Sequence, residues 1–107
     1  MMLQVVIPVK PGNAAVREGK LGPTIQKLLG DLKPEAAFFT ETNGNRSGYI
    51  FFDMKDASEI PKIAEPWFLA FNATLTIKPA MTPQDLGGSA SAAIEAAAKA
   101  HPKTFGS

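Results

Sequence analysis

The sequence predicts an α+β domain whose main elements follow the order β-α-β-β-α-β. Four short runs rich in Val, Ile, Phe and Thr alternate with two segments that carry apolar residues at helical spacing. Turn-forming residues 43–48 join the second run to the third as a hairpin. The four strands therefore form one antiparallel sheet, and right-handed crossovers place both main helices on the same face of it.

The composition is that of a small globular domain. The chain has 107 residues, close to the usual domain size, and no cysteine, which excludes disulfides and thiolate metal sites. A formal net charge of +1 gives no broad attraction to nucleic acid or acidic membranes. The sequence has neither a signal-peptide pattern nor a long apolar run. We therefore expect a cytoplasmic protein with no nucleic-acid or membrane partner.

The first strand and first helix are expected within residues 3–32. Residues 3–9 are rich in Val and Ile and are followed by a Pro-Gly pair, so they predict a strand and a turn. Asn13 is the expected N-cap of a helix with a kink or restart at Gly22 and Pro23. The buried stripe of this helix is predicted at Leu21, Ile25, Leu28, Leu29 and Leu32.

The hairpin and the second helix follow. Residues 36–42 and 49–54 are the predicted strands of the hairpin, joined by turn-forming residues 43–48. Ser58 is the expected N-cap of the second helix, and Asn72 its C-terminal stop. The apolar stripe of that helix is Ile60, Ile63, Ala64, Trp67, Phe68 and Phe71. Residues 73–78 alternate apolar and polar side chains and predict the fourth strand.

The C-terminal part predicts additional helix. Thr82, followed by Pro-Gln-Asp, is typical of a capping box with proline at the first helical position. Gly87 and Gly88 interrupt this helix, and residues 89–100 form an Ala-rich helix. We divide the chain into an α/β domain of residues 1–80 and a C-terminal helical extension of the same domain, residues 81–107.

Apolar residues occupy both faces of the predicted sheet. Phe38 and Phe39 take opposite faces of their strand, and Tyr49 and Phe51 oppose Ile50 on the next. In a sheet with helices on one side and water on the other, apolar and polar residues alternate along each strand more strictly than they do here. We therefore expect a second copy of the chain to cover the helix-free face. The sequence leaves open which alternation faces that interface.

Four segments carry a resemblance to a known superfamily. They are residues 7–13 (Ile-Pro-Val-Lys-Pro-Gly-Asn), 34–41, 64–72 and 81–86. Together with the element order, they resemble small uncharacterised bacterial proteins of the dimeric α/β-barrel superfamily, over residues 3–86. The resemblance implies a ferredoxin-like fold whose two sheets pack face to face around a shared cavity in a homodimer. That superfamily includes monooxygenases, isomerases, haem enzymes and binding proteins, so the resemblance specifies fold more than function.

No catalytic signature stands out in the sequence. The strongest candidates are the carboxylates Glu41 and Asp53, which we place near opposite positions of the hairpin, with Tyr49 on the same alternation as Asp53. A carboxylate desolvated in a barrel cavity would serve as a general base. The alternative is that both carboxylates lie in water at strand ends. His101, the only histidine, follows a helix end, where a solvated cation is favourable. We therefore expect no metal, haem or other cofactor.

Tyr49, Trp67 and Phe71 are the candidate ligand-binding residues. Aromatic side chains commonly line apolar cavities, and Tyr49 adds a polar tip to an apolar ring. The alternative for Trp67 and Phe71 is ordinary core packing, since both belong to a stripe with helical spacing.

We expect a homodimer that binds a small molecule in a mostly apolar cavity, either between two sheets or between sheet and helices. One alternative, implied by the resemblance, is a cofactor-independent monooxygenase or isomerase that uses a carboxylate and Tyr49. Another is a structural interaction module in which residues 89–100 dock on a partner. RNA-recognition motifs share the element order, but residues 3–9 lack the aromatic that stacks on a base. We therefore do not expect RNA binding.

Overall fold

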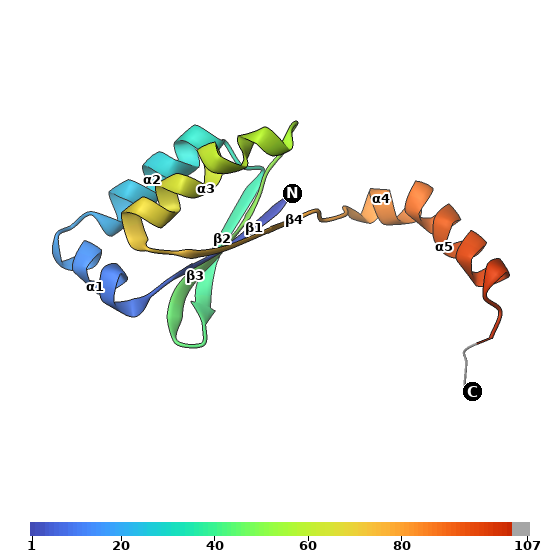
Figure 1. Ribbon diagram of the computed structural model, residues 1–107, viewed down its shortest axis with the longest axis horizontal. Helices are drawn as coiled ribbons and strands as arrows, with labels where there is room; N and C mark the ends of the chain where they lie inside the picture. Colours follow the sequence, from blue (N-terminus) through green and yellow to red (C-terminus); the bar gives the residue numbers. More distant parts are fainter. Residues whose placement is uncertain (104–107) are drawn as a thin grey trace.

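The computed structural model describes residues 1–103, which form an α+β chain with one four-stranded antiparallel sheet. The strands, in spatial order, are β2 (Ala36–Thr42), β3 (Asn45–Phe51), β1 (Met2–Ile7) and β4 (Thr74–Lys78). The helices α2 (Leu21–Leu32) and α3 (Ile60–Phe71) lie side by side over one face of the sheet (Figure 1). The shorter α1 (Val9–Arg17) lies between β1 and α2 in the chain.

The core lies between the sheet and these helices. Strand β1 is central, and its side chains Leu3, Val5 and Ile7 are at most 3% exposed. The register places Leu3 beside Ile50 of β3 and Ile77 of β4, so these side chains share the helix-covered face. The predicted stripe of α2 packs against this core, as do Trp67 and Phe71 of α3. Burial of each such large apolar side chain stabilises the fold by roughly 1.5–3 kcal/mol.

The first helix begins earlier than the sequence predicts. Strand β1 ends at Ile7, and α1 starts at Val9, so the residues predicted as a turn form its first helical turn. Pro11 is tolerated there because the first-turn N–H groups have no intrahelical acceptor. Asn13 is therefore not an N-cap. Its side chain instead accepts a hydrogen bond from Arg46 Nη1 at 3.0 Å.

The break between the two N-terminal helices also differs from prediction. The chain turns at Gly19, whose φ of 70° is in the left-handed region that favours glycine. Helix α2 then starts at Leu21, so Gly22 and Pro23 lie in its first turn and do not form the break itself.

The β2–β3 hairpin has a tighter turn than predicted. Strand β2 spans the predicted residues 36–42, but only Asn43 and Gly44 form the turn, with φ of 51° and 81°. Two consecutive residues with positive φ are typical of the two-residue turn that matches the twist of a hairpin. Strand β3 therefore starts at Asn45, directly opposite Thr42, and ends at Phe51.

The start of α3 is capped by Asp56 and not by Ser58. Asp56 Oδ1 accepts the N–H of Ser58 at 3.0 Å, and Glu59 Oε2 accepts the N–H of Asp56 at 3.1 Å. This capping box lies at the start of a short 3-10 helix, η1 (Ala57–Glu59), which leads directly into α3. Asn72, with φ of 53°, ends α3 as predicted.

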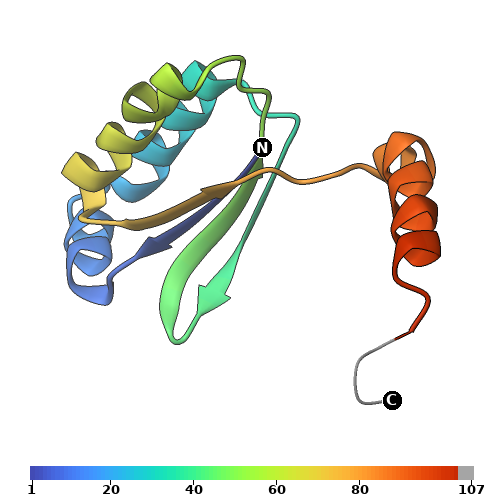
Figure 2. The ribbon, with the colours of Figure 1, turned by 45° about the vertical axis from the view of Figure 1, so that its right-hand side comes forward.

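Two further helices lie apart from the sheet, α4 (Pro83–Gly87) and α5 (Ser89–Ala100). Thr82 and Asp85 form the predicted capping box, with Thr82 Oγ1 accepting the N–H of Asp85 at 3.1 Å. Neither helix contains a buried residue, and Figure 2 shows both well away from α2 and α3. The radius of gyration, 18.4 Å, exceeds the ~13 Å of a compact domain of about this size. We call residues 79–100 the C-terminal arm.

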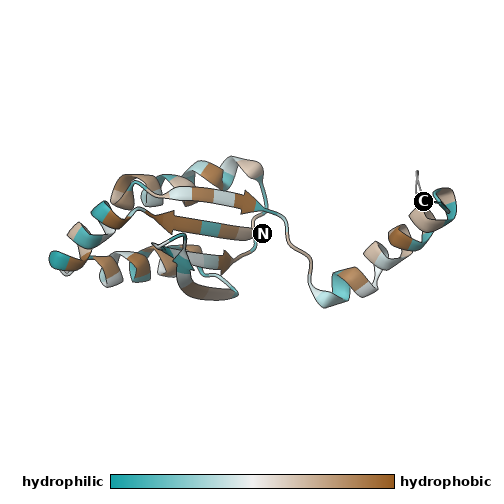
Figure 3. Ribbon diagram, turned by 90° about the horizontal axis from the view of Figure 1, so that it is seen from below, coloured by the Kyte–Doolittle hydropathy of each residue, from teal (hydrophilic) through white to brown (hydrophobic). Residues whose placement is uncertain are grey.

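The strands carry both apolar and polar residues (Figure 3). The register shows that the helix-free face of the sheet is mixed in character, which corrects the expectation of an apolar face. The register assigns to it the apolar Met2, Val6, Ala36, Phe38, Tyr49 and Phe51, and the polar Gln4, Thr40, Thr42, Ser47, Thr74, Thr76 and Lys78. The aromatic side chains gather at one end. Phe38 is 63% exposed and meets Phe51 edge-on, with ring centroids 6.5 Å apart. The apolar patch is thus local.

Candidate functional site

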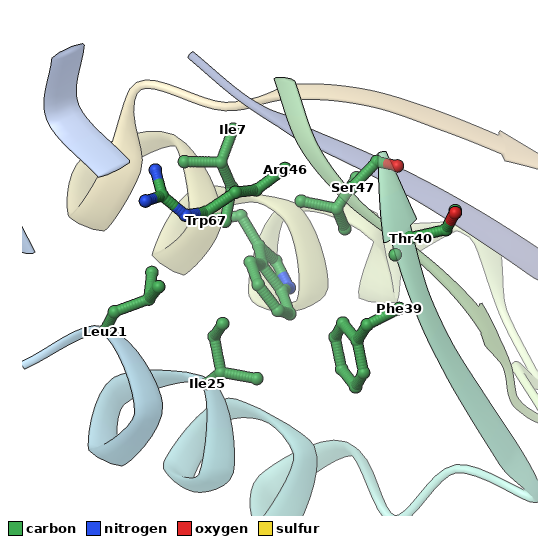
Figure 4. Close-up of a pocket in the computed structure, with 10 residues that line it drawn as sticks. Ile7, Leu21, Ile25, Phe39, Thr40, Arg46, Ser47 and Trp67 are labelled. Carbon is green, nitrogen blue, oxygen red and sulfur yellow. The ribbon is translucent and has the colours of Figure 1, made fainter. Parts of the chain in front are cut away.

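An apolar cavity of about 220 Å³ lies between the sheet, α2 and α3 (Figure 4). Central strands β1 and β3 form its floor, α2 forms one wall, and Trp67 of α3 and Phe39 of β2 complete the lining. The lining residues are Val5, Ile7, Leu21, Ile25, Phe39, Thr40, Arg46, Ser47, Gly48 and Trp67.

Gly48 lets the Phe39 ring lie close against the sheet at the edge of the cavity. The register places Gly48 of β3 between Val5 of β1 and Phe39 of β2. All other residues of these three strands carry a side chain. A Cβ atom added at Gly48 would lie 3.0 Å from the Phe39 ring. Phe39 lies over this glycine and remains 54% exposed, although its strand alternation faces the helices. The Phe39 ring therefore forms a side wall of the cavity and does not fill it.

Trp67 is the largest apolar side chain among the lining residues. Its side chain is 2% exposed, and its ring packs against Phe71 with centroids 6.2 Å apart. Figure 4 shows the indole facing Leu21 and Ile25 of α2. Trp67 is also the only tryptophan in the chain, so its fluorescence is a direct measure of what enters the cavity.

Arg46 is the one charged residue of the lining. It extends from β3 and is partly buried, and its Nη1 donates to Asn13 Oδ1 at 3.0 Å. Glu41 lies opposite Arg46 in the register, yet Glu41 Oε2 accepts the N–H of Gly44 at 2.9 Å. The one ion pair within 4.0 Å across residues 1–103 joins Lys20 to Glu18. Arg46 thus carries its charge without a carboxylate partner from the described part of the chain.

The two candidate catalytic carboxylates are not brought together. Glu41 lies by the hairpin turn, whereas Asp53 follows the far end of β3, and the strand between them is about 20 Å long at ~3.3 Å per residue. Both side chains are exposed and neither lines the cavity. The expectation that they lie near opposite positions is wrong, because the turn is two residues long instead of six.

The three candidate ligand-binding residues occupy three different places. Trp67 lines the cavity, and Phe71 is 2% exposed behind it. Tyr49 lies on the opposite face of the sheet, where its hydroxyl accepts a hydrogen bond from Gln4 Nε2 at 3.2 Å. An enzyme that uses a carboxylate and Tyr49 in one cavity would need a different arrangement.

Sequence reasoning missed Phe39 and Arg46 as cavity residues. The signal that could have found them is Gly48, because glycine inside a strand often marks a close approach or a gap. With Gly48 assigned to a turn, that signal was lost. With Gly48 assigned to β3, Phe39 falls beside it on the same face of the sheet.

Three further findings describe the chain as a whole. Among residues 1–103, no three His, Cys, Asp or Glu side chains lie close enough to hold a metal ion together. In the same range, no helix has both the length and the apolar character needed to cross a membrane. Comparisons of this chain with protein-family models, with curated proteins and with solved structures find no match.

Proposed function

We propose that this protein binds a small, mostly apolar molecule in the cavity between the sheet, α2 and α3. The observation that carries the proposal is the cavity itself, about 220 Å³ in volume and walled by Trp67, Ile25 and Phe39. A purely apolar cavity of about 150 Å³ is enough to admit benzene. This cavity therefore has room for a substituted ring or a branched alkyl group.

The physical drive for binding is removal of apolar surface from water. Phe39 is 54% exposed, and an occupant would cover its ring together with the facing side chains of α2. Each Å² of apolar surface removed from water contributes about 25 cal/mol. Since the walls come from helices and strands, the site is preformed, and little conformational entropy is lost on binding.

We also propose that two copies pair through their helix-free faces, as in the dimeric α/β-barrel superfamily of ferredoxin-like folds. The strand order β2-β3-β1-β4 and the exposed Phe38 beside Phe51 support this arrangement. The cavity lies on the other side of the sheet, so each subunit would carry its own binding site.

Trp67 fluorescence tests the binding proposal directly. We expect saturable changes in emission on titration with small ring compounds such as toluene, phenylacetamide and phenylacetate. Ile25→Phe, which places a larger side chain in the cavity, should abolish the change. Leu69→Phe should leave it intact, because Leu69 is 84% exposed on α3 and outside the cavity. Absence of saturable binding by all three compounds would contradict the proposed function.

A further inference from the structure

We infer that the ligand of this cavity is a small carboxylic acid, with an aromatic or branched apolar body against Trp67 and its carboxylate on Arg46. The inference rests on the proposed function and specifies its ligand class. It follows from the contrast between one positive charge and an otherwise apolar or uncharged lining.

Arg46 is held in place by α1. Its Nη1 donates to Asn13 Oδ1 at 3.0 Å, and this bond ties the guanidinium of β3 to a helix 33 positions away in sequence. The helix backbone approaches closely at Gly12, where an added Cβ would lie 2.8 Å from the same Nη1. Glycine at this position therefore makes room for the guanidinium. Figure 4 shows the guanidinium extending past Ile7 toward the Leu21 end of the cavity.

The hydrogen-bonding capacity of Arg46 is largely unused. A guanidinium carries five N–H donors, and among residues 1–103 the one side-chain acceptor is Asn13. Its cross-strand neighbour Glu41 is engaged with the backbone of the turn. The remaining donors form a planar fork that matches the two oxygens of a carboxylate. Beside apolar walls, where the dielectric constant is low, that charge pair is stronger than in water.

The single charge of Arg46 selects the kind of anion. A carboxylate carries one negative charge in a planar group, which one guanidinium neutralises. A phosphate monoester carries close to two charges at neutral pH. Lys20, at the start of α2, is paired with Glu18, and neither Lys20 nor Lys27 of α2 lines the cavity. We therefore assign a carboxylate and not a phosphate.

Fluorescence titration of Trp67 with matched compounds tests this assignment. Phenylacetate should bind at least tenfold more tightly than the neutral isostere phenylacetamide and than phenyl phosphate. Arg46→Gln should weaken phenylacetate binding at least tenfold and change phenylacetamide binding by less than twofold. Arg17→Gln is the control for net charge, because Arg17 is exposed at the end of α1 and outside the cavity. It should leave both affinities unchanged.

A second variant keeps the charge of Arg46 and removes the side chain that accepts its hydrogen bond. Asn13→Ala should weaken phenylacetate binding about threefold or more without affecting phenylacetamide, and it stands in for Arg46→Gln if that variant does not fold. Equal affinity for phenylacetate and phenylacetamide, or tighter binding of phenyl phosphate, overturns the carboxylate assignment and leaves the binding proposal standing. If Arg46→Gln weakens both ring compounds alike, the assignment is also overturned.

Discussion

Gly44 and Gly48 lie four residues apart and serve different physical needs. Gly44 has φ of 81°, and its place in the hairpin turn requires the backbone freedom of glycine. Gly48 does not have a positive φ, and what it provides is space, since a Cβ there would meet the Phe39 ring. The first glycine sets the register of the hairpin, and the second shapes the cavity.

Replacement of Gly44 tests the first of these roles. We expect Gly44→Ala to lower the free energy of unfolding by roughly 1–2 kcal/mol, because an alanine Cβ clashes with the backbone at positive φ. Gly44→Asn should cost less, since asparagine tolerates the left-handed region. Urea unfolding followed by Trp67 emission measures both. An alanine variant as stable as the asparagine variant would show that the turn relaxes to another conformation.

At the scale of the element, the sequence predicts type and order better than boundaries. Hydrophobic periodicity was sufficient for α2, α3 and all four strands, because those side chains form the core. Two of the boundary errors fall at Gly12 and Gly48, where the sequence pattern predicts a turn. Glycine destabilises a helix by about 1 kcal/mol relative to alanine, so a local sequence pattern that contains glycine does not predict a helix there.

Both glycines have a long-range reason that no local pattern contains. Gly12 lets α1 approach the guanidinium of Arg46, and Gly48 leaves space for the ring of Phe39. These contacts join residues more than 30 positions apart, or different strands of the sheet. The sequence-based prediction therefore missed Phe39 and Arg46 in the cavity lining, where the chain departs from local preferences.

The two capping boxes offer an element-scale prediction. Asp56→Ala should destabilise the domain by about 1 kcal/mol, because it removes the acceptor for the Ser58 N–H at the start of the η1–α3 segment that supplies Trp67. Thr82→Ala removes the equivalent cap of α4 but should leave the unfolding midpoint of the domain unchanged. The arm has no buried residue in either helix. Trp67 emission in urea reports the domain and not the arm, so a shift in midpoint for Thr82→Ala would contradict this separation.

The shape of the whole molecule separates the cavity from the aromatic patch on the sheet. The cavity opens on the helix-covered side, whereas the aromatic patch of Phe38 and Phe51 lies on the helix-free side. The C-terminal arm extends away from both in Figure 1. The side chains of its Ala-rich helix α5 are small, and the one large apolar residue, Ile94, is 58% exposed. Ligand binding and self-association should therefore be separable by substitution.

Phe38→Asp is the substitution that tests self-association. We expect the unaltered chain to sediment as a dimer at micromolar concentration and Phe38→Asp to sediment as a monomer, because an unpaired carboxylate is costly to bury. Leu69→Asp introduces the same charge at an exposed position of α3 and should remain dimeric. A monomeric unaltered chain, or equal dimerisation of the two variants, would contradict the interface.

Because the cavity lies across the sheet from Phe38, monomeric Phe38→Asp should still show the full response of Trp67 to phenylacetate. A loss of that response on dissociation would mean that the second subunit helps to form the binding site.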